Sequence, residues 1–326
     1  EIGAQIILGN NYHLFLRPGL ETFRKAGGLH KFMAWEGPIL TDSGGYQVYS
    51  MGDQVKLDEE GVIFRSHVDG SQHRFTPENV VDMQRTIGSD IQMVLDECPP
   101  YPAERQYIEA SVARTHRWAE RARRHFLDTK PPYGYPQLQF GIVQGGVHED
   151  IRAESCAAIT EMDFEGNAIG GLSVGEPIPE MYHIAGHCCE RLPTEKPRYL
   201  MGVGTPEDLL QCIAVGVDMF DCVLPTRNAR HAKLYDWDGM RNAKAAKWKD
   251  DHTPINADSA LAYDRIHSRA YLRHLFNVGE HYAQHIASVH NLHFFLQLVK
   301  TARREIINGT FGDWLKATLP AIQQKH

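Results

Sequence analysis

Two aspartates in this sequence could form a catalytic pair. Asp221 follows the apolar residues Met219-Phe220, and a short Pro-containing turn after it carries Arg227 and Arg230. A carboxylate beside guanidinium groups suits attack on an electrophilic carbon of a phosphate-bearing substrate. Asp42 ends a second apolar run in the same way. Two carboxylates that flank a sugar carbon can carry out retaining glycosyl transfer, in which one is the nucleophile and the other transfers protons.

Each aspartate also has a purely structural explanation. Asp221 could cap a turn beside two solvated arginines, and Asp42 could be the N-cap or turn residue before Ser43-Gly44-Gly45. For an isolated Asp–Arg pair this explanation would be preferred. The catalytic interpretation is favoured here because six further motifs precede the segment around Asp221, each where a predicted strand ends.

Short apolar segments rich in β-branched residues alternate with longer helical patterns. The strand candidates are Gln5–Leu8, Ile39–Leu40, Ile91–Leu95, Gln139–Val143, Ala168–Gly170, Arg198–Met201 and Val217–Phe220. Helices are expected at 102–127, 148–162 and 179–192, and two more begin at Thr76-Pro77 and Thr205-Pro206 and end at Gly88 and Gly216. This alternation implies parallel strands. Polar or Gly-rich clusters follow every strand, which predicts a (β/α)8 barrel rather than an open doubly wound sheet.

The strand-end motifs resemble those of the tRNA-guanine transglycosylases (queuine tRNA-ribosyltransferases) of bacterial type. The resemblance covers nearly the whole chain, in order. It is carried by Gly9-Asn10-Asn11-Tyr12-His13-Leu14, Thr41-Asp42-Ser43-Gly44-Gly45-Tyr46-Gln47, Asp96-Glu97-Cys98-Pro99-Pro100, Gln144-Gly145-Gly146, Gly170-Gly171-Leu172-Ser173-Val174-Gly175-Glu176, Tyr199-Leu200-Met201-Gly202-Val203-Gly204 and Met219-Phe220-Asp221-Cys222-Val223-Leu224-Pro225-Thr226-Arg227-Asn228-Ala229-Arg230.

The resemblance implies an α/β fold of the (β/α)8 TIM type. Seven strands are counted where such a barrel needs eight, and the family carries another strand upstream of where this chain starts. We therefore expect residues 1–231 to hold barrel strands 2–8 with the active site, and an N-terminal portion of the protein to be missing. Residues 232–326 are expected to form a basic, irregular insertion (to about residue 265) and C-terminal helices, within one continuous domain.

The resemblance also implies an activity and the residues that perform it. The family replaces the wobble guanine of a tRNA anticodon through a covalent aspartyl–ribosyl intermediate, in queuosine biosynthesis. By resemblance, Asp221 is the nucleophile that attacks the anomeric carbon and expels guanine. Asp42 is the general acid/base that also deprotonates the incoming base, and two displacements give net retention.

A purine-shaped base needs groups that recognise its edge and groups that cover its faces. Asp96 can accept two hydrogen bonds from the N–H groups of guanine. The Gln144 side chain and the Gly171 backbone N–H can donate to the carbonyl oxygen of the base. Tyr46 and Met201 can sandwich the ring. All five positions match the family. Considered alone, Met201 would be a barrel-core residue and Gln144 a locally satisfied loop amide.

The loop at 172–176 indicates which base enters. In the family, a backbone carbonyl at the position of Leu172 receives an aminomethyl group, and the residue at Glu176 supports the peptide that flips between bound bases. Val174 and Cys98 match the bacterial pattern. The resemblance therefore favours 7-aminomethyl-7-deazaguanine as the incoming base, with a steric argument against the bulkier queuine.

Local charge, rather than net charge, predicts contact with RNA. The net charge is −7, yet seven Lys/Arg and two Asp lie between Arg227 and Lys249. By resemblance, Arg227 and Arg230 would grip the RNA around the target nucleotide, and we expect Lys244 and Lys247 to contribute. A solvated helix face is the alternative explanation for such a run.

One family feature is absent. The family usually binds structural zinc through Cys-x-Cys-x-x-Cys and a later His, and here those positions read Ser259, Leu261, Asp264 and His290. This set cannot form a tetrahedral thiolate site. We therefore expect no zinc and no other cofactor, with apolar packing around Leu261, Tyr263 and Ile266 in its place.

Bulk composition limits the remaining possibilities. The chain has 326 residues, 42% hydrophobic and 23% charged, which is typical of a globular protein. Six scattered cysteines without a Cys-x-x-Cys pair indicate a reducing compartment, and we expect a cytoplasmic protein. The resemblance implies a homodimer built through the C-terminal region. A catalytically inactive tRNA-binding subunit and a barrel glycoside hydrolase are the alternatives; the two aspartates argue against the first and the guanine-recognising residues against the second.

Overall fold

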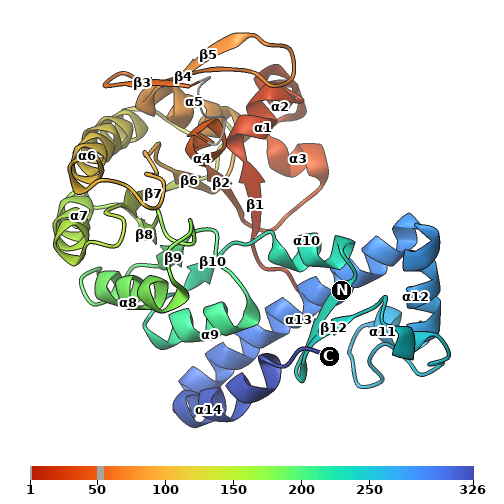
Figure 1. Ribbon diagram of the computed structural model, residues 1–326. Coiled ribbons are helices and arrows are strands. Elements are labelled where there is room, and N and C mark those ends of the chain that lie inside the picture. The colour runs from red at the N-terminus through yellow and green to blue at the C-terminus, as the bar shows by residue number, and fades with distance from the viewer. Residues whose placement is uncertain (1, 50–54) are drawn as a thin grey trace. The chain divides into compact units, whose positions relative to one another are not determined.

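The chain forms two compact units in the computed structural model, which describes residues 2–49 and 55–326 (Figure 1). The sheet unit contains residues 5–49, 55–201 and 215–219. The C-terminal unit contains residues 2–4, 202–214 and 220–326.

A seven-stranded sheet forms the centre of the sheet unit. The strand order is β1-β2-β6-β7-β8-β9-β10, and the pairs from β1 to β9 are parallel. The strands are β1 (Ile7–Asn10), β2 (Ile39–Asp42), β6 (Ile91–Met93), β7 (Leu138–Val143), β8 (Gly166–Ile169), β9 (Arg198–Leu200) and β10 (Met219–Phe220). The pairing of Asn10 with Asp42 brings two polar residues together where β1 and β2 end. All seven strands were predicted from the sequence, and the α/β class is confirmed.

Helices connect these parallel strands, and α6, α7 and α8 lie on the outer side of the sheet (Figure 1). The helices of this unit are α1 (Asn11–Leu16), α2 (Leu20–Ala26), α3 (Leu29–Met33), α4 (Gly45–Tyr49), α5 (Pro77–Ile87), α6 (Arg105–Asp128), α7 (Glu149–Glu161) and α8 (Ile178–Cys189). The predicted ends of α5 are confirmed. Thr76 and Asn79 form a reciprocal capping box, and Gly88 ends the helix with a φ of 82° that favours glycine.

An antiparallel sheet between β2 and α5 was not predicted. It consists of β3 (Lys56–Asp58), β4 (Gly61–Arg65) and β5 (Gln72–Phe75). Val62, Phe64 and Phe75 from this sheet are fully buried against Tyr12 and Trp118. These strands therefore add to the apolar core of the sheet unit.

The C-terminal unit is mainly helical. Its elements are α9 (Pro206–Ala214), α10 (Leu224–Arg230), β11 (Lys233–Asp236), β12 (Gly239–Asn242), a 3₁₀ helix η2 (Ala246–Trp248), α11 (Ala262–Ile266), α12 (Arg269–Val278), α13 (His281–Ile307) and α14 (Phe311–Ile322). The expectation of an irregular segment from about 232 is wrong at its start, because β11 and β12 form an antiparallel hairpin. The C-terminal helices are confirmed.

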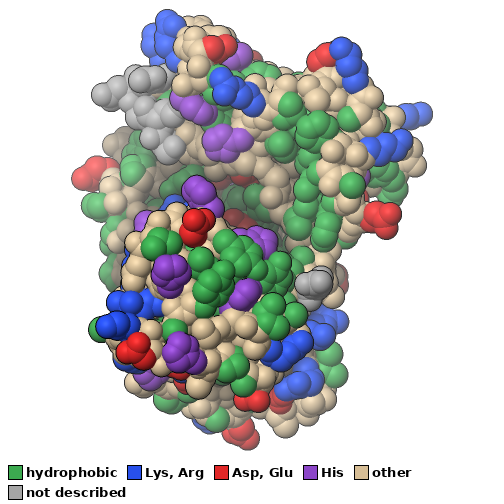
Figure 2. Space-filling view, turned by 90° about the vertical axis from the view of Figure 1, so that its right-hand side faces the viewer, with side chains coloured by type: hydrophobic (Ala, Val, Ile, Leu, Met, Phe, Trp, Pro, Cys, Tyr) green, Lys and Arg blue, Asp and Glu red, His purple; other side chains and the backbone are tan. Residues whose placement is uncertain are grey.

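The side of this unit that carries α11 and α12 gathers histidine and hydrophobic side chains (Figure 2). Ile266, Tyr271, Val278 and Tyr282 are exposed there. His267 packs edge-on against Tyr282 and accepts from or donates to its hydroxyl at 3.0 Å. We call these five residues the aromatic–histidine face.

Candidate active site

Asp42 is held at the end of β2 by hydrogen bonds to both of its carboxylate oxygens. The Asn10 side chain donates to Oδ2 at 2.6 Å, and the backbone N–H groups of Asn11 and Gly44 donate to Oδ1 at 3.1 and 2.9 Å. The bond from Gly44 closes a local turn, which is the contact expected if Asp42 were only a turn residue. The other two come from the end of β1, so the orientation of Asp42 is set by a neighbouring strand as well as by its own turn.

Asp96 and Gln144 form a buried pair that follows β6 and β7. Gln144 Nε2 donates to Asp96 Oδ2 at 2.7 Å, and Gln144 is fully buried. Burial raises the pKa of Asp96 to about 6, against a smaller lowering effect of the bond from Gln144. Gln144 Oε1 is buried without a hydrogen-bond partner among the described residues. A buried carboxyl and an amide with unused bonding capacity suit the recognition of a polar ligand.

Gly171 comes so close to Gln144 that only glycine fits. A Cβ at this position would lie 2.2 Å from Gln144 Oε1, and the φ of 64° disfavours other residues. The loops that follow β7 and β8 are therefore in direct contact. The predicted residues Asp96, Gln144 and Gly171 are brought together by these contacts.

Glu176 organises the loop that follows Gly171. Its carboxylate accepts hydrogen bonds from the backbone N–H groups of Ser173 and, at 3.0 Å, Val174. In a trans peptide the C=O and the following N–H point in opposite directions. The Leu172 carbonyl therefore points away from Glu176, as a receptor for a ligand ammonium group requires.

The remaining predicted base contacts differ in exposure. Tyr46 is 60% exposed on α4, whereas Met201, directly after β9, and Cys98 are half-buried. Burial raises the pKa of the Cys98 thiol to about 12, so this side chain stays neutral. An exposed aromatic ring is available to cover a ligand.

Asp221 directly follows β10 and lies in the C-terminal unit. Its Oδ1 accepts a hydrogen bond from the Gly202 backbone N–H at 2.8 Å. Three residues later α10 begins, with Pro225 in its first turn and Arg227 and Arg230 in its last turn. Both arginines are exposed and make no ion pair among the described residues. They remain available to bind phosphate.

Asn291 of α13 fixes the helix that carries these arginines. Its side-chain nitrogen donates to the carbonyls of Pro225 and Lys233 at 2.9 Å, and its oxygen accepts from the Tyr235 N–H at 3.0 Å. The side chain is fully buried and joins α10 to β11. No local sequence pattern indicates this role, because the contacts span more than 50 positions.

Comparison with known proteins assigns the chain to a family. The family model described as queuine tRNA-ribosyltransferase matches residues 1–324. The queuine tRNA-ribosyltransferase of Solidesulfovibrio magneticus is 52% identical over 322 residues, which cover 99% of this chain and 85% of that protein. Those of Nitratidesulfovibrio vulgaris and Thermoanaerobacter pseudethanolicus are 53% and 50% identical over 316 and 306 residues, covering 97% and 94% of this chain and 83% and 80% of the relatives.

The chain belongs to the queuine tRNA-ribosyltransferase family. Its predicted resemblance to the tRNA-guanine transglycosylases and its assignment to the (β/α)8 fold of that family are confirmed. As a member of this family, the chain is a pentosyltransferase. The roles of individual residues remain predictions.

The zinc positions of the queuine tRNA-ribosyltransferase family hold a different structure here. Asp264 Oδ1 lies 2.9 Å from His290 Nδ1, and Ser259 Oγ donates to Asp264 Oδ2 at 2.6 Å. His290 Nε2 lies 2.9 Å from the Tyr235 carbonyl, which can only accept, so this nitrogen carries a proton. Asp264 and His290 are buried. We call Ser259, Asp264 and His290 the clasp.

The clasp does not fit a metal ion. Both ring nitrogens of His290 are engaged, and Leu261, which is buried at the position of the second family cysteine, has no ligand atom. No group of three or more His, Cys, Asp or Glu that could hold a metal occurs in the part of the chain that the structure describes. The expected apolar replacement is only partly correct. Leu261 is buried, but Ile266 is 71% exposed and the polar clasp fills the centre.

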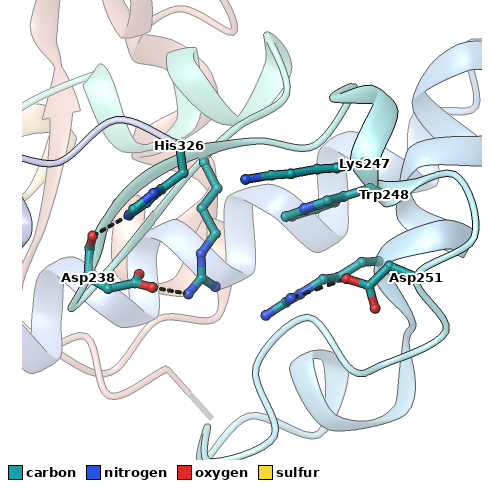
Figure 3. A pocket seen from close by; sticks show the side chains of 7 residues that line it. Asp238, Lys247, Trp248, Asp251 and His326 are labelled. Carbon is teal, nitrogen blue, oxygen red and sulfur yellow. Dashed lines mark hydrogen bonds and ion pairs between the residues drawn. The ribbon is translucent and has the colours of Figure 1, made fainter.

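The basic residues between 241 and 269 differ in whether they pair with a carboxylate. A hollow of about 270 Å³ is lined by Asp238, Arg241, Lys247, Trp248, Asp251, Arg269 and His326 (Figure 3). Within it Arg241 pairs with Asp238, and Arg269 pairs with Asp251. Lys247 is exposed and has no carboxylate partner among the described residues, and the same holds for Lys244. The two predicted lysines are thus available to RNA, whereas Arg241 is already neutralised.

Proposed function

We propose that this chain replaces the wobble guanine of a tRNA anticodon with 7-aminomethyl-7-deazaguanine. The family match over residues 1–324, together with the buried Asp96–Gln144 pair, carries the proposal. In the first displacement a carboxylate oxygen of Asp221 bonds to ribose C1′ and the bond from C1′ to guanine N9 breaks. In the second, a nitrogen of the new base bonds to C1′ and the ester to Asp221 breaks.

Asp42 handles the protons in this proposal. It supplies a proton to the departing guanine and removes one from the incoming base, so that the base attacks with a lone pair. The Asn10 side chain holds Oδ2 in position at 2.6 Å. The net reaction exchanges one base for another with retention at C1′.

Guanine is recognised at its polar edge. Ionised Asp96 accepts from the ring N–H and the exocyclic NH₂, while Gln144 and the Gly171 N–H donate to the carbonyl oxygen. Adenine has no matching set of donors, so it is rejected. Tyr46 and Met201 cover the two faces of the ring.

The protein distinguishes the bacterial base by its aminomethyl group. Its ammonium donates to the Leu172 carbonyl, which points away from Glu176 because the Ser173 N–H is held by that carboxylate. Val174 and Cys98 limit the room beside this group, which disfavours the bulkier queuine. Arg227 and Arg230, with Lys244 and Lys247, bind phosphates of the anticodon loop.

One assay tests this function. The full-length protein is incubated with unmodified tRNA and radiolabelled guanine, and label in the tRNA is counted. Incorporation is expected from the wild type and from Asp218→Asn, a nearby aspartate that pairs with Arg198 instead. Incorporation that is lost in Asp221→Ala supports the proposal. Binding of tRNA without incorporation by the wild type would favour the inactive partner subunit, and cleavage of glycosides without tRNA binding would favour a hydrolase.

The proposal includes a C-terminal unit that needs no zinc. Burial opposes the charged ring of His290, but the hydrogen bond and charge of Asp264 outweigh it, and the pKa of His290 is raised. Burial alone would raise the pKa of Asp264, but the hydrogen bond and charge of His290, together with the bond from Ser259, outweigh it and the pKa is lowered. A buried ion pair thus joins α11 to α13 where the family places a metal. Elemental analysis of purified protein should find zinc well below one equivalent, and one equivalent would contradict this.

We also propose that the protein is a cytoplasmic homodimer. The aromatic–histidine face leaves Ile266 71% and Val278 58% exposed, which is unusual for large apolar side chains unless another surface covers them. A second copy of the chain is the expected occupant. The cytoplasm contains the tRNA substrate and keeps thiols reduced, in agreement with six free cysteines. No described helix is long and apolar enough to cross a membrane.

A further inference from the structure

Arg152 on α7 is a fully buried arginine that donates to three backbone carbonyls. Nε donates to Gly146 at 2.9 Å, Nη1 to Val143 at 3.0 Å and Nη2 to Gly171 at 3.4 Å. Val143 ends β7 and Gly146 lies in the loop that follows it, whereas Gly171 follows β8. One side chain therefore joins the two loops that carry the base-recognising residues.

This arrangement is unfavourable if packing is its only purpose. A buried guanidinium is costly unless its charge is balanced. Its hydrogen-bond acceptors among the described residues are all carbonyls, and the Glu176 carboxylate acts on it only through its charge. Burial lowers the pKa of Arg152, which reflects the same cost. An apolar side chain of similar volume would fill the space without it. The planar fork of donors gives something that an apolar side chain cannot, namely a fixed position for three carbonyls.

The loop after β7 is shaped around this arginine. Gly145 has a φ of 149°, and a Cβ there would lie 3.0 Å from Arg152 N and 3.1 Å from its Cδ. Gly145 directly follows Gln144. The residue after Gln144 therefore lies beside Arg152, with no room for a side chain between them, so Arg152 borders the backbone of the loop that carries Gln144.

The loop after β8 is held at two points. Arg152 binds the Gly171 carbonyl, and Glu176 binds the Ser173 and Val174 N–H groups. The Leu172 carbonyl lies between these two fixed points. Without the first one, the peptides on either side of Gly171 are free to rotate, because glycine itself imposes little restraint.

We propose that Arg152 is a positioning residue that sets the affinity for the free base by holding both loops in their binding geometry. It touches neither base nor ribose in this role. The inference rests on the proposed function, since it assigns Gln144, Gly171 and Leu172 to the base site.

Steady-state exchange kinetics test this role with a matched control. Arg85 is a second buried arginine with neutral partners; it donates to the carbonyls of Phe126 and Thr129 and to Gln137 Oε1, none of which belongs to the site. Arg152→Met, Arg152→Lys and Arg85→Met are compared for KM and kcat with guanine and with 7-aminomethyl-7-deazaguanine, and for KM with tRNA. Loss of folded protein lowers kcat and leaves KM unchanged, so KM separates positioning from stability.

Arg152→Met should raise KM for guanine roughly tenfold or more, because hydrogen bonds from a charged group are lost. The rise should be larger for the aminomethyl base, which also depends on the Leu172 carbonyl, and KM for tRNA should not change. Arg152→Lys should recover part of the affinity, and Arg85→Met should keep the wild-type KM. A wild-type KM in Arg152→Met, or in Arg152→Lys if the first variant does not fold, overturns the inference, as does an equal rise in Arg85→Met. Failure of the wild type to exchange any base would instead overturn the proposed function.

Discussion

The carboxylates of this protein differ in their surroundings, and these differences fit separate roles. Asp42 accepts hydrogen bonds from a side chain and two backbone N–H groups, which hold it in one orientation. Asp96 is 7% exposed, and burial raises its pKa to about 6. A carboxyl that is costly to ionise in the empty site can recover that cost when a ligand donates two hydrogen bonds to it. The burial of Asp96 is therefore consistent with recognition of a base that carries such donors.

The raised pKa of Asp96 predicts a pH dependence of base binding. Only the ionised carboxylate can accept two bonds from guanine, so kcat/KM for guanine should fall by about tenfold per pH unit well below pH 6. Stability of the free protein should respond in the opposite direction. Because the folded pKa lies above the ordinary value of 3.8, the contribution of Asp96 to stability is present below pH 3.8 and is lost as the pH rises to about 6.

The variant Asp96→Asn separates this effect from other titrating groups. It should lose most guanine exchange, because the amide offers a donor where two acceptors are needed, and its residual activity should lack the inflection near pH 6. Exchange rates measured from pH 4.5 to pH 8 in both proteins provide the comparison. An unchanged inflection in Asp96→Asn would assign the pH dependence to another group.

At the scale of elements, the clasp connects parts of the C-terminal unit that are distant in sequence. Asp264 lies on α11 and His290 on α13, and His290 also contacts the Tyr235 carbonyl on β11. A tetrahedral metal site would join the same segments. The clasp achieves this with a buried ion pair, whose loss leaves an unpaired charge in the interior.

Removal of one clasp partner should therefore destabilise the protein. Asp264→Ala is expected to lower the free energy of unfolding by about 3–5 kcal/mol, the range for breaking a buried ion pair. Asp258→Asn, an exposed change in the same segment, should stay within about 0.5 kcal/mol of the wild type. Urea denaturation followed by circular dichroism measures both. Chelators should leave the wild-type transition unchanged, and a large loss of stability in EDTA would show that a metal is present.

The parallel strands were predictable because each is a short apolar segment followed by a polar motif. Thr76 and Gly88 marked the ends of α5 for similar local reasons. The hairpin β11–β12 was missed because each of its strands is only four residues long and carries a weak strand signal. The roles of Arg152 and Asn291 depend on contacts between distant segments, which no local pattern reveals. The residues of the clasp could be identified from the sequence because they occupy the zinc positions of the family. Their pairing, in which Asp264 contacts His290, could be seen only in the structure.

The sequence predicts that the whole molecule is one continuous domain. The chain contains two compact units, and residues 202–214 and 220–326 form most of one of them. Since the chain passes between the units at more than one point, we expect both to unfold together. Calorimetry should show one transition with equal calorimetric and van't Hoff enthalpies. Two separate transitions would contradict the single domain.

The proposed homodimer is tested on the aromatic–histidine face. Light scattering after gel filtration should give twice the chain mass of 36.9 kDa for the wild type. Ile266→Asp should produce monomers, since it places a charge in an apolar interface. Ile307 at the end of α13 is also 71% exposed, and Ile307→Asp should remain dimeric. A monomeric wild type, or dimers in Ile266→Asp, would contradict the assignment of this face.

The covalent bond between Asp221 and the ribose can be tested by trapping the intermediate. Radiolabelled unmodified tRNA is mixed with the protein, quenched in acid and separated on a denaturing gel. The wild type and Asp218→Asn should show a labelled protein–RNA adduct that disappears when excess guanine is added before the quench. Asp221→Ala should show no adduct and no exchange. An adduct of equal intensity in Asp221→Ala would contradict this role for Asp221, because the ester would then involve another side chain.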